Sequence, residues 1–212
     1  VLYFDRLNPW SKRKTAGQKT RTWRLWGKVI LAAVPAGIVG VLFDDWMNAH
    51  FYTYTVVAIA LIVYGIAFIV IERVRGNKAA KAKKAEDISV GQSVAVGCFQ
   101  VLSLIPGTSR SGSTIMGALI ADVSRTAAAE FSFFLAIPVM LGASLLKLVR
   151  FGLAFTTMEL VLLLVGMAVA FIVSILVIRF LMNYIKKHDF KVFGWYRIAL
   201  GLLVLVWFFL IR

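Results

Sequence analysis

Five long apolar segments constrain the fold of this sequence more than any other feature. They cover residues 26–43, 51–71, 127–149, 158–182 and 192–211. Because about 20 helical residues cross the roughly 30 Å of hydrocarbon in a bilayer, each segment is long enough to span a membrane. Hydrophobic residues make up 60% of the chain, whereas about 45–50% is typical of soluble domains. The sequence therefore predicts an all-α, polytopic membrane helix bundle.

The positive charge of the chain fits the same conclusion. Lys and Arg outnumber Asp and Glu by 24 to 10, but the basic residues concentrate in short loops between apolar segments. Excess Lys and Arg mark cytoplasmic loops, so the residues before 26 and the loop at 72–87 are placed on the cytoplasmic side. This pattern argues against nucleic-acid binding. The single cysteine, Cys98, excludes an intrachain disulfide and a thiol-rich metal site.

A sixth apolar region, 90–123, is interrupted in the middle. The interruption leaves two pieces of roughly 16 and 10 residues, each short of the approximately 20 that a full crossing requires. Irregular backbone at membrane depth is tolerated only where it is buried in protein or lines a cavity. We therefore expect two half-helices that form a re-entrant hairpin. The alternative is a kinked helix whose arginine reaches the lipid headgroups.

The loop charges also predict inverted-topology repeats. If the hairpin enters and leaves on the cytoplasmic side, the first two long segments run outward and then inward, whereas the last two run inward and then outward. Inverted repeats with broken helices are typical of membrane proteins that bind substrate near the midplane. We expect one membrane domain, 1–212, in which 1–88 holds the remainder of the first repeat and the cytoplasmic loop, and 89–212 holds the second repeat with the hairpin 90–123.

Candidate chemistry lies at the break in the hairpin. Pro106 removes a backbone donor and Gly107 allows a sharp turn, so the first half-helix is expected to end there. Arg110 follows, and an arginine at membrane depth usually faces a cavity or a partner. A helix N-terminus beside a guanidinium favours an anion, phosphate above all. Ser111, Ser113 or Thr114 is predicted to cap the second half-helix, and Thr108, Ser109 and Ser111 add hydroxyl donors or a nucleophile.

Specific roles are also predicted for two charged residues and four small residues of the long apolar segments. Glu130 opens a span and is expected to cap it or to pair with Arg125. Arg197 lies just inside the last span, where a headgroup contact is favoured over a cavity. The small residues expected to pack closely between helices are Gly37, Gly40, Gly166 and Ala170.

Residues 100–112 (QVLSLIPGTSRSG) resemble the second signature of the undecaprenyl-diphosphate phosphatase family of the bacitracin-resistance type. Residues 129–138 (AEFSFFLAIP) and 195–197 (WYR) also resemble segments of that family. The resemblance implies a bacterial plasma-membrane enzyme that hydrolyses undecaprenyl diphosphate to undecaprenyl phosphate and inorganic phosphate, recycling the lipid carrier of peptidoglycan synthesis. A polyprenyl-phosphate transporter or flippase is the alternative, because broken helices and inverted repeats also suit transport.

The resemblance also implies roles for the residues of the break. Arg110 would bind the diphosphate and stabilise charge during phosphoryl transfer, and Ser109 and Ser111 would hydrogen-bond the phosphates. These three are the predicted catalytic residues. The predicted substrate-binding residues are Gln100, Pro106, Gly107, Thr108, Gly112 and Thr114. No cofactor is expected to be bound by the chain itself, although Mg²⁺ or Ca²⁺ is a candidate assisting ion. The expected partners are the polyprenyl diphosphate and membrane lipids, and a homodimer is left open.

The sequence departs from the family pattern in one respect. The first family signature, with two glutamates, a Pro-x-Ser-Ser run and a histidine, is not found in these 212 residues. Residues 1–4 resemble the end of an apolar segment, and in the predicted inverted repeats one span and one hairpin of the second repeat have no counterpart in the first. The expectation is therefore a fragment that carries the phosphate-binding half of the site and has little activity alone.

Overall fold

The computed structural model describes residues 2–76, 78–152 and 156–211, and it is helical throughout, with no strand in these ranges. Five helices are long and apolar enough to cross a membrane, as predicted. The elements are α1 (Phe4–Leu7), α2 (Ala16–Phe51), α3 (Tyr54–Arg75), η1 (Ala85–Asp87), α4 (Val90–Val101), η2 (Leu102–Leu104), α5 (Arg110–Ile120), α6 (Arg125–Phe151), α7 (Thr157–Ile185) and α8 (Lys191–Ile211).

The first long helix begins ten residues before the predicted span because its start is capped. The Thr15 side chain accepts a hydrogen bond from the backbone N–H of Gln18, and the Gln18 side chain accepts one from the N–H of Thr15. Such a capping box satisfies two otherwise unpaired backbone donors. The basic stretch that follows therefore continues the helix rather than forming a loop.

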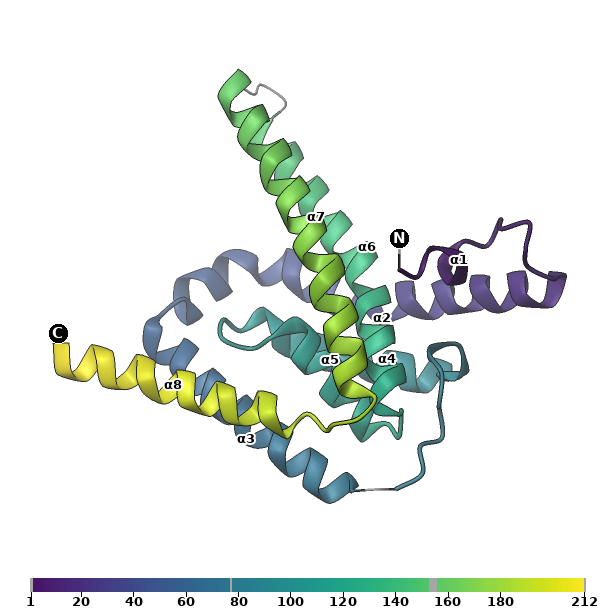
Figure 1. Cartoon of the computed structure of the whole chain (residues 1–212). Helices are drawn as coiled ribbons and strands as arrows, with labels where there is room; N and C mark the ends of the chain where they lie inside the picture. Colours follow the sequence, from purple (N-terminus) through teal and green to yellow (C-terminus); the bar gives the residue numbers. More distant parts are fainter. Residues whose placement is uncertain (1, 77, 153–155, 212) are drawn as a thin grey trace.

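Helices α3 and α8 lie side by side and run antiparallel (Figure 1). Glycines make the contact possible: a Cβ atom at Gly65 would lie 2.7 Å from the backbone oxygen of Gly194, and one at Gly194 would lie 2.7 Å from the oxygen of Gly65. The predicted packing glycines behave differently, since Gly37 and Gly166 face open space and Gly40 has only Leu104 at 3.5 Å. That prediction was wrong for Gly37 and Gly166.

Helices α4 and α5 form a compact pair in the middle of the fold, as Figure 1 shows. The backbone N–H of Lys81 donates a hydrogen bond to the backbone oxygen of Asp122 at 2.9 Å, and the N–H of Ser124 donates one to the oxygen of Ala82, also at 2.9 Å. Gln92 Nε2, near the start of α4, also donates to the backbone oxygen of Ala121 after α5 at 2.7 Å, so the two ends of the pair lie together, as a hairpin requires. That the pair enters and leaves at one membrane face, and that the fold contains inverted repeats, stay predictions.

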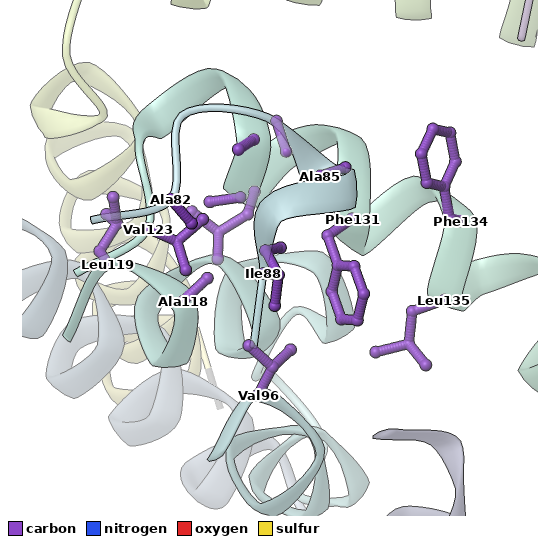
Figure 2. Close-up of a cluster of buried hydrophobic side chains, with 14 of the residues drawn as sticks. Ala82, Ala85, Ile88, Val96, Ala118, Leu119, Val123, Phe131, Phe134 and Leu135 are labelled. Atoms are coloured by element: carbon purple, nitrogen blue, oxygen red, sulfur yellow. The ribbon is translucent and has the colours of Figure 1, made fainter. Parts of the chain in front are cut away.

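Buried apolar side chains hold the hairpin against its neighbours. Figure 2 shows how side chains of the loop before α4 meet those of α4, α5 and α6 in one cluster. Each of its large members is almost fully removed from solvent, which is the main favourable term in packing. The labelled members are Ala82, Ala85, Ile88, Val96, Ala118, Leu119, Val123, Phe131, Phe134 and Leu135.

Helices α6 and α7 project together from this centre (Figure 1). None of the most apolar stretch of α7 is buried within the described chain. A helix that is apolar all round and unburied matches a lipid environment. The length and polarity of α7 thus agree with a membrane span.

The amino-terminal residues are anchored by ion pairs. The predicted apolar stub at 1–4 includes Val1, which lies outside the described residues; Tyr3 packs edge-on against Phe134 at a centroid distance of 5.3 Å. Arg6 reaches Glu130 at 2.7 Å and Glu86 at 2.7 Å. The predicted pairing of Glu130 with Arg125 was therefore wrong, since Arg125 pairs with Glu72 instead.

Candidate phosphate-binding site

The turn between α4 and α5 has the backbone that its sequence requires. After η2, Ile105 is extended (φ −74°, ψ 124°), as expected for a residue before proline. Gly107 has φ +90°, and a Cβ atom there would lie 2.5 Å from the backbone oxygen of Val57. Only glycine meets both conditions, because it tolerates positive φ and leaves room for α3.

The second half-helix is capped by Ser109, whose Oγ accepts a hydrogen bond from the N–H of Gly112 at 3.2 Å. The prediction that Ser111, Ser113 or Thr114 caps this helix was wrong. An N-cap residue must lie just outside the helix, and α5 already begins at Arg110. Its first residue therefore carries the guanidinium.

The hydroxyl groups of the turn are mostly engaged with nearby protein atoms. The Ser109 and Ser111 hydroxyls lie 3.0 Å apart and form a hydrogen bond. Thr108 Oγ1 donates to the backbone oxygens of Leu102 and Ile105. Thr114 is buried, and its hydroxyl lies 2.7 Å from that of Ser132 on α6. Thr114 thus joins α5 to α6, whereas the hydroxyls of Ser109 and Ser111 remain at the start of α5.

A cavity of about 650 Å³ lies between α2, the α4–α5 turn and α6. Its polar lining consists of Gln100, Ser103, Arg110 and Lys147. The remaining wall is apolar or small and comes from Ala33, Ala36, Gly37, Gly40, Val41, Leu104, Pro138, Val139, Gly142, Ala143 and Leu146. The site thus combines a small polar region with long apolar walls, as ligand pockets commonly do.

Two polar side chains of this cavity lack hydrogen-bond partners. Gln100 is fully buried, and neither its Oε1 nor its Nε2 has a partner among the described residues. Arg110 Nη1 is buried and is likewise unpartnered within the described chain. Leaving such groups unpaired costs about 1–3 kcal/mol each, and more for a charged group. A phosphate oxygen is an acceptor suited to such unsatisfied donors, because hydrogen bonds between a charged donor and an anionic acceptor are strong.

The structure thus brings Gln100 and Arg110 to one cavity across ten residues of broken helix. Ser103, which also lines the cavity, was not among the predicted site residues, although it lies inside the motif one turn after Gln100; its hydroxyl donates to the Gln100 backbone oxygen at 2.6 Å. Lys147 was also missed as a lining residue. Two predicted catalytic residues, Ser109 and Ser111, do not line the cavity. The other predicted substrate-binding residues do not line it either; they are Pro106, Gly107, Thr108, Gly112 and Thr114.

Among the described residues, the charged groups elsewhere form ion pairs rather than a metal centre. Among the described residues, no three His, Cys, Asp or Glu side chains lie close enough together to hold an ion. The buried carboxylates are instead held by arginines, Glu72 by Arg125 and Glu130 by Arg6. The charged side chains that line the cavity itself, Arg110 and Lys147, are both cationic.

Comparison with known proteins gives consistent matches over nearly the whole chain. Undecaprenyl-diphosphatase of Enterococcus faecalis is 56% identical over 208 residues, which are 97% of this chain and 75% of that protein. Undecaprenyl-diphosphatase 1 of Clostridioides difficile (strain 630) is 56% identical over 211 residues, covering 100% and 76% respectively. Undecaprenyl-diphosphatase of Limosilactobacillus fermentum is 52% identical over 214 residues, covering 100% and 78%.

The chain spans about three quarters of the length of these relatives. Its residues 1–203 match the family described as bacitracin resistance protein BacA. The match includes the broken helix, the cavity and all five membrane-length helices except the last residues of α8. The chain therefore belongs to the bacitracin resistance protein BacA family.

Proposed function

We infer that this protein is an undecaprenyl-diphosphatase, a multi-pass enzyme of the bacterial plasma membrane. It hydrolyses undecaprenyl diphosphate to undecaprenyl phosphate and inorganic phosphate. The relatives that bear this name are more than half identical over almost the whole chain. The observation that carries the inference at the site is Arg110, a cation with an unpaired buried N–H in a cavity whose walls are mostly apolar.

The reaction is a hydrolysis of a phosphoric anhydride. Water adds its oxygen to the terminal phosphorus, the bond from that phosphorus to the bridging oxygen breaks, and undecaprenyl phosphate leaves with the electron pair. Negative charge builds on the phosphoryl and bridging oxygens as this occurs. A preorganised cation in a water-poor site stabilises such charge more effectively than water does.

Arg110 supplies that cation in our proposal. The guanidinium binds the diphosphate through its free N–H groups, and the start of α5 adds the positive end of a helix dipole. Gln100 donates through its unpaired amide to a phosphate oxygen. Ser109 and Ser111 flank Arg110 just outside the lining of the cavity, and in our proposal they turn toward the phosphate and exchange their mutual hydrogen bond for bonds to it. The apolar walls from α2 and α6 receive the first isoprene units of the lipid.

A divalent cation that assists the reaction would enter with the substrate. Mg²⁺ is commonly held by one or two carboxylates together with substrate phosphates rather than by a complete protein cage. The described residues offer no cluster of three acidic, His or Cys ligands, so the diphosphate oxygens would supply most of the coordination. Mg²⁺ or Ca²⁺ dependence measured at saturating lipid tests this proposal.

The central experiment measures phosphate release from undecaprenyl diphosphate in detergent micelles. We expect Arg110→Ala and Arg110→Lys each to lower kcat by about 100-fold or more, the scale seen when a transition-state donor is removed. Arg179→Ala is the matched control, because Arg179 is an exposed arginine of α7. Unchanged release in both Arg110 variants would contradict the assigned role. Movement of labelled lipid between leaflets without phosphate release would favour a transporter.

A further inference from the structure

A second group of buried polar atoms is contributed by α3, α5 and α8. Arg197 Nη1 on α8 is buried and has no hydrogen-bond partner among the described residues. Ser113 on α5 is fully buried, and its hydroxyl interacts with the phenol of Tyr64 on α3. Tyr64 is also close enough to Arg197 to interact with its charge. None of the three lines the cavity that holds Arg110.

Close backbone approaches fix the arrangement of the three helices. The contact between Gly65 and Gly194 brings together the stretches of α3 and α8 that carry Tyr64 and Arg197. One turn further along α3, the Phe68 ring packs on Gly112, where a Cβ atom would lie 3.2 Å from Phe68 Cε2. Gly112 immediately precedes Ser113. The positions of all three polar side chains therefore depend on tightly packed helices rather than on loops.

This group has no acidic member to balance the arginine. The buried carboxylate of α3, Glu72, lies two turns beyond Tyr64 and is held by Arg125. An unpaired guanidinium within a membrane-spanning helix is costly, and such residues usually mark ligand or ion pathways. A headgroup contact, the role favoured from the sequence, does not use a nitrogen that is buried inside the protein. The unpaired Arg197 donor points to an anionic ligand.

We propose that Tyr64, Ser113 and Arg197 form a second oxyanion-binding position, which takes a phosphate group. The proposal rests on the phosphatase function inferred above. Ser113 and Arg110 are three residues apart on α5 and so occupy neighbouring positions on its surface. The second position therefore adjoins the first. Its phosphate comes either from the diphosphate of the bound lipid or from inorganic phosphate, the product that must leave.

The test compares Arg197→Met and Arg197→Lys with the matched control Arg179→Met. If the position binds substrate phosphate, Arg197→Met raises KM for undecaprenyl diphosphate by about tenfold or more, as expected for the loss of a charged hydrogen bond. If it binds free phosphate, the same variant raises the inhibition constant of inorganic phosphate by a similar factor. Arg197→Lys restores part of either effect. Arg179→Met changes neither quantity.

A stability measurement separates this role from a structural one. Without ligand, Arg197→Met is expected to melt at the same temperature as the parent or higher, because a buried unpaired charge has been removed. Added inorganic phosphate or pyrophosphate should raise the melting temperature of the parent and not that of the variant. This binding readout needs no turnover, so it distinguishes failure of the second position from failure of the proposed function.

Two smaller substitutions keep the proposal testable if Arg197→Met does not fold. Ser113→Ala and Tyr64→Phe each remove one hydroxyl group and leave the helix contacts unchanged. Each should weaken phosphate-dependent stabilisation and leave the ligand-free melting temperature within a few degrees of the parent. Unchanged KM, unchanged phosphate inhibition and unchanged phosphate-dependent stabilisation in folded variants would overturn the proposal.

Discussion

Arg125 holds the buried carboxylate of Glu72 with three hydrogen bonds. Its Nε lies 3.0 Å from both Glu72 oxygens, and its Nη2 lies 2.5 Å from Oε2. Glu72 Oε1 also accepts from the backbone N–H of Phe190 at 3.2 Å. The Glu72 side chain therefore joins the end of α3 to the start of α6 and to the turn between α7 and α8. These elements surround the α4–α5 hairpin.

Replacing Glu72 should destabilise the whole fold. Removing one partner of a buried ion pair typically costs about 3–5 kcal/mol because it leaves the other charge without compensation. Arg125 is partly exposed, so we expect Glu72→Ala to cost about 3 kcal/mol, the lower end of that range. The measurement is unfolding in detergent with a denaturant. Asp122→Asn, which breaks the exposed pair with Lys81, is the control and should cost under about 1 kcal/mol. Equal losses in the two variants would contradict the prediction.

The elements that were predicted correctly are those specified by local sequence. Each membrane span can be recognised in the sequence, because length and polarity alone decide whether a segment can cross hydrocarbon. The break in the hairpin was predictable from Pro106 and Gly107, since their backbone restrictions act on their immediate neighbours. Gln100 and Arg110 were placed in one site because the resemblance to the phosphatase family implies that both contribute to it.

The features that were missed depend on contacts between distant segments. The partner of Glu130 is Arg6, 124 residues away, whereas the predicted partner, Arg125, was chosen for nearness in sequence. Gly65 and Gly194 were not distinguished from Gly166, because only the packed fold shows that α7 faces outward while α3 and α8 touch. The group formed by Tyr64, Ser113 and Arg197 comes from three helices, so no spacing within one segment could reveal it.

Gln100→Leu should separate stability from function. Leucine has a similar volume and lacks the two amide atoms that are buried without partners. Replacing an unsatisfied polar group by an apolar one of similar shape is neutral or stabilising, so the melting temperature should hold or rise. The KM for undecaprenyl diphosphate should rise several-fold, since a donor to the phosphate is lost. A lower melting temperature together with an unchanged KM would indicate a structural role instead.

Acid should weaken the anchor of the amino-terminal residues through Glu86. Burial alone would raise the pKa of this carboxyl group, but hydrogen bonds from Arg6 and from the Glu86 backbone, with the charges of Arg6 and Lys84, lower it below its ordinary value of 4.5. Because the unfolded chain then binds the proton more readily, the stabilisation is complete above pH 4.5 and is lost as the pH falls through the lower folded pKa.

The prediction for Glu86 is tested by melting curves recorded across this acidic range. The melting temperature of the parent should fall progressively below the ordinary pKa of the Glu86 carboxyl group. Glu86→Gln should have a lower melting temperature at neutral pH and should lose less of it on acidification. Arg6→Met should reduce the same pH dependence, because Arg6 provides the main hydrogen bonds to Glu86. Parallel curves for the parent and Glu86→Gln would show that another group is responsible.

Gly107→Ala should impair the site through the backbone. Gly107 and Gly152 both have φ +90°, so alanine is strained at either position. Only at Gly107 would the new Cβ atom meet a neighbour, the backbone oxygen of Val57 at 2.5 Å, whereas Gly152 faces open space. Gly152→Ala therefore measures backbone strain without a collision, about 1–3 kcal/mol for a conformation (φ 90°, ψ 173°) that is essentially restricted to glycine. Gly107→Ala should cost more and should lower kcat/KM, because relieving the collision moves the turn that leads into Arg110. Activity equal to that of Gly152→Ala would show that the turn does not position the guanidinium.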